Sequence, residues 1–188
     1  MNLDFNKQCN EMFVKHLNKC KIYGEYGCGA STIFSIDNFK GKIYSVETDK
    51  KWRDKIVKNV KDKKAEQRVS IEWVDVGEVA NWGYPKTMSK KENFIEYQKS
   101  IWKKEKPDFV LIDGRFRVAC FLQSILHCND KCEIIIDDYY DRKHYFCVEE
   151  VLELKQIYGD RMALFIKDKD LDLEKVQKMY EEHKYVLG

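Results

Sequence analysis

The sequence of 188 residues contains no apolar run that approaches the ~18 residues needed for a membrane-spanning helix. Its first residues, Met1 to Phe5, lack the basic-then-apolar pattern of a secretory signal. The seven cysteines are odd in number and include no Cys-x-x-Cys pair, which argues against a disulfide framework. We therefore expect no membrane span and a reducing, cytoplasmic location.

Glycine and proline are also scarce, with nine and two residues, and no segment is repeated or low in complexity. Hydrophobic residues make up 44% of the chain and charged residues 35%, a balance that excludes a disordered protein. Protein domains contain about 150 residues on average, so a chain of this length is expected to form one domain. We expect residues 1–188 to form that single domain.

Charge is distributed unevenly, although the net charge is only +2. The stretch 50–64 carries eight basic residues against Asp54 and Asp62. A solvated helix face is the favoured interpretation, and a surface for an anionic partner such as RNA is the alternative. The basic residues are Lys50, Lys51, Arg53, Lys55, Lys58, Lys61, Lys63 and Lys64.

Short apolar runs alternate with amphipathic segments along the chain, which predicts an α/β fold with a mostly parallel sheet covered by helices on both faces. The predicted strands are 22–26, 43–46, 69–76, 109–112, 134–136 and 163–166. Helices are expected at 3–20, from Ser31 or Thr32, at 52–60, 94–102, 118–126, around 148–152 and at 173–183.

Five predicted strands end in at least one carboxylate. These residues are Glu25, Glu47, Asp75, Asp113 and the pair Asp137-Asp138. Helix capping explains one or two of them. Ligands of parallel sheets bind beyond the carboxyl ends of the strands, so five acidic ends indicate a ligand site there.

The first of these ends also carries a glycine turn, Gly27-x-Gly29, which allows close approach to a ligand. The turn alone is a weak signal, because the third glycine of the dinucleotide fingerprint is replaced by Thr32. Glu47 is placed to accept ribose hydroxyls, a feature of both NAD and S-adenosylmethionine sites. Glu25 favours the second cofactor, because a carboxylate there would repel a pyrophosphate.

Three segments together, Glu25–Thr32, Val46–Asp49 and Asp75-Val76, resemble the successive motifs of class I S-adenosylmethionine-dependent methyltransferases. The resemblance covers about residues 20–140 and implies a Rossmann-like, mostly parallel seven-stranded sheet. It also implies that Trp52 or Trp82 packs on the adenine ring, with core packing as the alternative. The implied cofactor-binding residues are Glu25, Tyr26, Gly27, Cys28, Gly29, Ser31, Thr32, Glu47, Thr48, Asp75, Val76 and Asp113.

The acceptor side lacks the Asn/Asp-Pro-Pro-aromatic loop of nucleic-acid adenine methyltransferases, because the fourth strand ends in Asp113-Gly114-Arg115-Phe116. A nucleic-acid partner is therefore disfavoured. Asp113 with Asp137-Asp138 is similar to the acidic set of metal-dependent O-methyltransferases, and Ile136–Tyr139 resembles the group that acts on sugars. The resemblance implies Asp113, Asp137 and Asp138 as ligands of an Mg²⁺ that would activate an acceptor hydroxyl.

Other roles for these residues stay open. Asp113 or His144 could act as a general base instead of a metal ion. Asp137-Asp138 could cap the helix that follows Arg142. Arg115 and Arg117 could pair with the acids in place of a metal, or bind an acidic or polyhydroxy acceptor. The candidate catalytic residues are Asp113, Asp137, Asp138, His144 and Arg115.

The resulting hypothesis is an S-adenosylmethionine-dependent O-methyltransferase that acts on a hydroxyl of a glycan or another small molecule, with Mg²⁺ as an optional aid. The long, aromatic segment 77–106 is predicted to form a lid over the acceptor. The alternatives are an RNA-directed methyltransferase, a nicotinamide-dependent reductase of similar fold, and a binding protein of this fold without catalysis. The acceptor's identity and the oligomeric state are not predicted.

Overall fold

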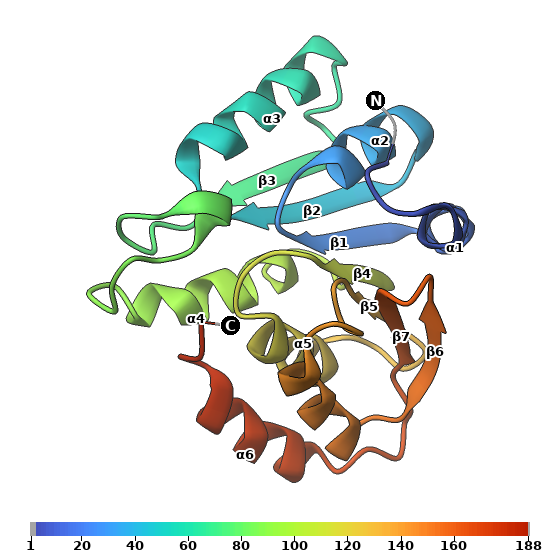
Figure 1. The fold of residues 1–188 in the computed structure, drawn as a ribbon. Helices are drawn as coiled ribbons and strands as arrows, with labels where there is room; N and C mark the ends of the chain where they lie inside the picture. The colour runs from blue at the N-terminus through green and yellow to red at the C-terminus, as the bar shows by residue number, and fades with distance from the viewer. Residues whose placement is uncertain (1–2, 188) are drawn as a thin grey trace.

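One mixed sheet of seven strands forms the centre of the protein in the structure, a computed structural model that describes residues 3–187 (Figure 1). The strands are β1 (Ile22–Tyr26), β2 (Lys42–Glu47), β3 (Val69–Trp73), β4 (Phe109–Ile112), β5 (Glu133–Ile136), β6 (Leu154–Tyr158) and β7 (Met162–Ile166). Their order is β3-β2-β1-β4-β5-β7-β6, and only β7 runs antiparallel to its neighbours. The predicted α/β class with seven mostly parallel strands is confirmed.

Six α-helices cover the two faces of this sheet. They are α1 (Lys7–Leu17), α2 (Ala30–Asn38), α3 (Lys50–Asp62), α4 (Glu92–Lys99), α5 (Arg117–His127) and α6 (Leu173–His183). Three 3₁₀ segments, η1 (Asn81–Gly83), η2 (Ser100–Trp102) and η3 (Lys143–Glu150), lie between them. No helix in residues 3–187 is long and apolar enough to cross a bilayer.

The strands supply side chains to two hydrophobic cores, one on each face of the sheet. In β4, Phe109 and Leu111 pack with α1, α2 and α3, whereas Val110 and Ile112 pack with α4, α5 and α6. All four side chains are fully buried. Burial on both faces explains why the sequence of this strand is apolar throughout rather than alternating.

Helix ends follow the expected chemistry of side-chain caps. Asn6, Asp49 and Asp172 each accept a hydrogen bond from a backbone N–H in the first turn of α1, α3 and α6. Along α3 only Ile56 and Val60 are buried, and most of its basic side chains lie in solvent. The interpretation of 50–64 as a solvated helix face therefore agrees with the structure.

The structure departs from the predicted elements in four places. The opening helix α1 covers Lys7–Leu17 rather than 3–20, and residues 1–2 lie outside the described part of the chain. β3 ends at Trp73 rather than at residue 76, and a 3₁₀ segment stands where a helix was expected around 148–152. The sixth strand, β6, carries no apolar pattern in the sequence, because Leu-Lys-Gln-Ile-Tyr lies at the edge of the sheet and exposes Lys155 and Gln156. An edge strand needs no apolar run.

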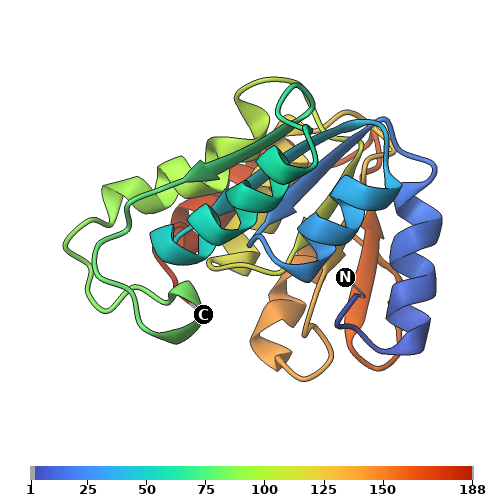
Figure 2. The same ribbon diagram turned by 90° about the horizontal axis from the view of Figure 1, so that it is seen from above.

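The predicted segment 77–106 is divided in the structure. Residues 92–102 form α4 and η2, and Phe94, Tyr97 and Ile101 are buried in the core. Residues 77–91 are mostly exposed and contain the short η1 turn and an isolated bridge between Val79 and Pro85. Figure 2 shows that this segment projects from the sheet on the same side as the chain that follows β5. A lid is therefore compatible only with residues 77–91.

Candidate functional site

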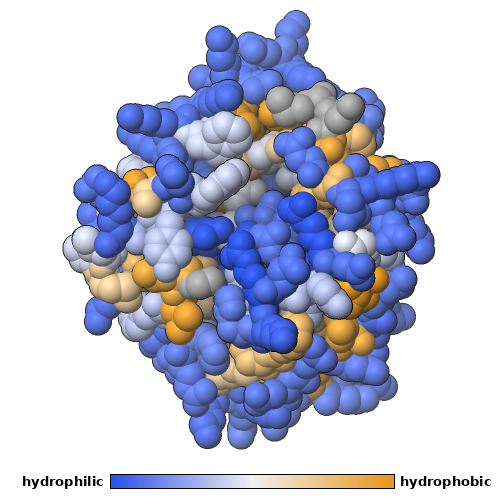
Figure 3. Space-filling model, in the orientation of Figure 1, coloured by the Kyte–Doolittle hydropathy of each residue, from blue (hydrophilic) through white to orange (hydrophobic). Residues whose placement is uncertain are grey.

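A cavity of about 830 Å³ opens beyond the carboxyl ends of β1, β2, β4 and β5. Its volume lies within the ~300–1,000 Å³ of small-molecule sites. Strongly hydrophilic side chains gather near the centre of the face in Figure 3. The cavity is lined by Asp4, Phe5, Gly27, Cys28, Gly29, Ala30, Ser31, Glu47, Asp49, Trp52, Asn81, Trp82, Gly83, Tyr84, Asp113, Gly114, Arg115, Arg117, Asp138, Arg142 and Arg161.

The two glycines of the first turn have different structural roles. Gly27 has a positive φ of 88°, and a Cβ atom there would lie 2.7 Å from the Cα of Gly114. Gly27 therefore allows the turns after β1 and β4 to meet. A Cβ atom at Gly29 would have no protein atom within 4 Å, so the backbone at Gly29 is open toward the cavity.

Glu25 lies inside the protein and does not line the cavity. Its carboxylate is fully buried and accepts hydrogen bonds from the hydroxyls of Tyr23, Ser31, Thr32 and Ser45. Burial raises the pKa of Glu25, although the four hydroxyls act in the opposite direction. The hydroxyl oxygen of Thr32 also accepts from the Gly29 N–H at 2.8 Å. Glu25 thus supports the glycine turn from the protein interior, through Thr32. The sequence predicts instead that Glu25 contacts the cofactor, and the structure does not show this.

Glu47 lines the cavity at the end of β2 and is largely buried. Its Oε1 atom accepts from the N–H groups of Thr48 at 2.7 Å and Asp49 at 3.0 Å, whereas among residues 3–187 Oε2 accepts only from the Cys28 N–H at 3.1 Å. A carboxylate oxygen has room for a second donor, so Oε2 keeps one free acceptor position. Burial raises the pKa of Glu47 against the effect of these N–H groups.

Two tryptophans stand at the edge of the cavity rather than in the core. Trp52 is 42% exposed, and its indole N–H donates to the Cys28 carbonyl at 2.6 Å. Trp82 is 89% exposed and has a φ of 62°, a strained conformation for a bulky residue. Core packing, the alternative considered for both residues, is therefore wrong.

Several residues assigned to cofactor binding do not line this cavity, namely Tyr26, Thr32, Thr48, Asp75 and Val76. Asp75 instead pairs with Lys90 at 2.5 Å and accepts from the Gly77 N–H at 3.1 Å. The Thr48 hydroxyl donates to the Gly83 carbonyl at 2.8 Å and attaches η1 to the end of β2. Tyr26 and Val76 are buried in the core, and so is the Thr32 side chain.

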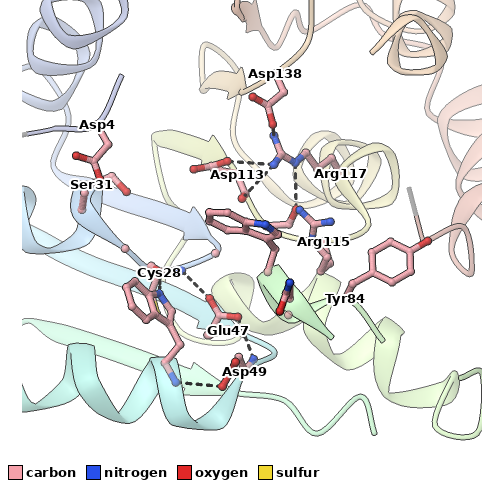
Figure 4. A pocket seen from close by; sticks show the side chains of 18 of the residues that line it. Asp4, Cys28, Ser31, Glu47, Asp49, Tyr84, Asp113, Arg115, Arg117 and Asp138 are labelled. Carbon is pink, nitrogen blue, oxygen red and sulfur yellow. Dashed lines mark hydrogen bonds and ion pairs between the residues drawn. The ribbon is translucent and has the colours of Figure 1, made fainter. Parts of the chain in front are cut away.

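At the other end of the cavity, three aspartates meet three arginines. Figure 4 shows Arg117 between Asp113 and Asp138. Arg117 lies 3.1 Å from Asp113 and 3.3 Å from Asp138, and Arg142 lies 2.9 Å from Asp138. Arg161 donates both Nε and a terminal nitrogen to the two carboxylate oxygens of the fully buried Asp137, each at 2.6 Å. Each carboxylate thus has a guanidinium partner, and the cluster is neutral overall when all three carboxylates are ionised.

The environments of Asp113 and Asp137 shift the pKa values of these two carboxyl groups in opposite directions. Burial raises the pKa of Asp113 well above its usual range, and the charges of Asp137 and Asp138 add to this rise against Arg117. Burial alone would raise the pKa of Asp137 too, but the bonds from Arg161 hold it below the ordinary value. Asp137 is therefore a fixed anion, and Asp113 is the carboxyl that takes up a proton more readily.

The three aspartates offer carboxylate oxygens within 4.8 Å of one another, as the predicted metal site requires. Their partners are the obstacle, because a guanidinium group lies against at least one oxygen of each of the three carboxylates. A divalent cation would have to bind beside three positive charges or displace them. The arrangement therefore does not fit a metal ion. The capping alternative also differs from the structure, because η3 has no side-chain cap.

The two other candidate catalytic residues lie in contrasting places. Arg115 lines the cavity, whereas His144 is exposed, stacks edge-on against Tyr145, and is absent from the cavity lining. Arg117, weighed as a partner of the acids, does pair with them.

Arg142 and Arg161 complete the cluster, and neither was predicted. Arg142 stands only four residues after Asp138, in the turn that follows β5, and this short separation of opposite charges is a usable signal. Arg161 belongs to the turn between β6 and β7, where the sequence carries no comparable signal. This turn is held by Asn6, whose side chain donates to the Gly159 carbonyl at 2.8 Å.

No protein-family model matches the sequence, and no curated protein matches it either. Solved structures do resemble it. A methyltransferase-like protein from Silicibacter pomeroyi superposes with a TM-score of 0.84 and 24% sequence identity, covering 97% of this chain and 96% of that one. An O-methyltransferase from Bacillus cereus in complex with S-adenosylhomocysteine gives a TM-score of 0.60 at 14% identity, covering 88% and 83%.

An RNA methyltransferase from Salinibacter ruber, also with S-adenosylhomocysteine, gives a TM-score of 0.50 at 13% identity and covers 90% of this chain and 99% of that one. These likenesses show that the chain has the class I methyltransferase fold. Because the fold serves both O-methyltransferases and an RNA methyltransferase, the chemistry has to be inferred from the site itself.

Proposed function

We propose that this protein is an S-adenosylmethionine-dependent methyltransferase that transfers a methyl group to a hydroxyl of a sugar, a glycan or another small molecule. One observation carries the proposal. The open backbone at Gly29, the free acceptor position of Glu47 and the raised-pKa carboxyl of Asp113 all face a single cavity. The class I methyltransferase fold supports it.

The cofactor end of the cavity fits S-adenosylmethionine. The open backbone at Gly29 admits the methionine portion, and Oε2 of Glu47 accepts a ribose hydroxyl. The exposed indoles of Trp52 and Trp82 offer flat surfaces for the adenine. When bound, the cofactor supplies an electrophilic methyl group on a sulfonium.

Asp113 is the proposed proton acceptor. An alcohol is a weak nucleophile, and forming the ether bond releases the hydroxyl proton, which a positioned base can take up. Asp113 lines the cavity beside the glycine turn, and its raised pKa suits this role better than the fixed anion Asp137. The aspartate–arginine cluster holds the Asp113 side chain in place. The proposed transfer uses Asp113 as the base and needs no metal ion.

The first experiment is isothermal titration with S-adenosylmethionine, S-adenosylhomocysteine and NADH, each with and without Mg²⁺. We expect micromolar binding of both sulfur nucleotides, no binding of NADH, and no effect of Mg²⁺. Binding of NADH alone would favour the reductase alternative. A lack of binding by all three would leave only the fold and would contradict the proposal.

A matched pair of glycine variants tests the cofactor end. Gly29→Ala adds a methyl group where no protein atom lies within 4 Å, so the melting temperature should change by less than about 2 °C. Affinity for S-adenosylhomocysteine should fall by about tenfold or more, because the methyl group enters the cavity. Unchanged affinity would remove Gly29 from the proposed cofactor contact.

Gly27→Ala is the structural counterpart of this variant. Its methyl group would meet the Gly114 backbone, and the positive φ is unfavourable for alanine. We expect a loss of about 2 kcal/mol or more in the free energy of unfolding, measured by urea denaturation. Equal stability of the two variants would contradict the distinct roles assigned to the two glycines.

Residues 77–91 are the proposed lid. Trp82 and Tyr84 of this mostly exposed segment line the cavity, and it is attached to the neighbouring chain by the Thr48–Gly83 hydrogen bond and the Asp75–Lys90 ion pair. Amide exchange should be faster in 77–91 than in β4 and should slow when S-adenosylhomocysteine binds. Protection equal to that of β4, with no response to the ligand, would contradict the lid.

A further inference from the structure

Arg115 differs from the other guanidinium groups of the cavity in having no anionic partner. Arg117, Arg142 and Arg161 each pair with at least one aspartate. Within residues 3–187, Arg115 lies within 4.0 Å of no carboxylate. Its Nε atom is shielded from solvent and has no hydrogen-bond partner. The acceptor end of the cavity thus contains one uncompensated positive charge.

The position of Arg115 is set by the surrounding backbone. Its N–H lies 3.3 Å from the Tyr97 hydroxyl, and its carbonyl accepts from the Cys120 thiol. The guanidinium carbon lies 5.9 Å from the centre of the Tyr84 ring, and both side chains line the cavity (Figure 4). Arg115 follows Asp113 by two residues and lines the same cavity, so a molecule that reaches Asp113 also comes near Arg115.

A partly buried guanidinium without a partner is unfavourable, and an oxyanion that presents two oxygens relieves this cost through paired, charge-assisted hydrogen bonds. We infer that Arg115 selects acceptors that carry a carboxylate or phosphate group near the hydroxyl to be methylated. This inference rests on the proposed function and adds a substrate class to it. The neutral aspartate–arginine cluster does not compete for the anion, because its arginines are already paired.

The test uses two matched probe pairs, titrated into protein saturated with S-adenosylhomocysteine. The first pair is 3,4-dihydroxybenzoate and 3,4-dihydroxybenzamide, and the second is glucose 6-phosphate and glucose. We expect the anionic member of at least one pair to bind about 10- to 100-fold more tightly than the neutral one. A preference within the first pair indicates recognition of a carboxylate, and a preference within the second pair indicates recognition of a phosphate.

Substitutions of Arg115 test whether this side chain causes the preference for the anionic probe. Arg115→Gln should abolish it and leave S-adenosylhomocysteine affinity within about threefold of wild type, whereas Arg115→Lys, which keeps the charge but lacks the paired donors, should retain part of it. Arg53→Gln is the matched control, because Arg53 pairs with Asp54 outside the cavity and its loss should leave the preference intact.

Each outcome separates this inference from the proposed function. Wild-type protein that binds S-adenosylhomocysteine but shows no anion preference in either pair overturns the inference and leaves the methyltransferase proposal standing. A preference that persists in Arg115→Gln also overturns it, since another group must then bind the anion. Failure to bind S-adenosylhomocysteine contradicts the proposed function itself.

Discussion

Glu25→Ala should lower the free energy of unfolding by about 3–5 kcal/mol, because it leaves buried hydroxyls without an acceptor and opens a cavity. At ~2–4 °C per kcal/mol for a chain of this size, the melting temperature should fall by about 6–20 °C. Affinity for S-adenosylhomocysteine should fall as well, since Thr32 links Glu25 to the Gly29 N–H. Glu153→Ala, at an exposed position, is the control and should change stability by less than about 0.5 kcal/mol.

Glu25→Gln adds a pH test of the same residue. The folded-state pKa of Glu25 is raised, so its stabilising contribution is complete below the unfolded pKa of about 4.3 and decreases as pH rises through the folded pKa. Glutamine does not titrate. The stability of wild type relative to Glu25→Gln should therefore decline as pH rises from about 4. A difference that is constant with pH would contradict a raised pKa.

Asp113→Asn should reduce the rate of methyl transfer by about 10²- to 10⁴-fold, the range usual for loss of a general base. Asparagine keeps the shape and an oxygen for Arg117 but takes up no proton. The rate is measured as release of S-adenosylhomocysteine under single-turnover conditions, with the tightest-binding probe of the matched pairs as acceptor.

Two controls accompany this measurement. Affinity of Asp113→Asn for S-adenosylhomocysteine should stay within about threefold of wild type, which separates loss of chemistry from loss of binding. Asp130→Asn, an exposed position outside the cavity, should transfer methyl groups at the wild-type rate. Full activity of Asp113→Asn would remove Asp113 as the base.

Most of the fold was predictable because both faces of the central strands are buried. Continuous apolar runs such as Phe109–Ile112 mark these strands, and the intervening helices carry regular apolar spacing. The strand β6 has no such mark, because its position depends on pairing with β7 rather than on its own burial. The 3₁₀ form of η3 likewise depends on packing of Tyr145 and Val148 in the finished core.

Part of the site was predictable from the rule that residues directly after parallel strands gather at one edge of the sheet. That rule brings Asp113 and Asp138 to one cavity, as the structure does. It does not state which way a side chain points, so Glu25, which faces the protein interior, was assigned to the ligand. It also omits Arg161, which approaches Asp137 only through the pairing of β5 with β7.

The reversed direction of β7 has a consequence for how such a site can diversify. A parallel strand contributes its final residues to the ligand edge, but β7 begins there, so the turn before it supplies Arg161 to the acceptor end. Surface turns accept exchange and insertion more readily than buried strands do. One end of the cavity therefore depends on the β6–β7 turn, whose Arg161 balances the charge of the buried Asp137, whereas the glycine turn and Glu47 at the other end are built without it.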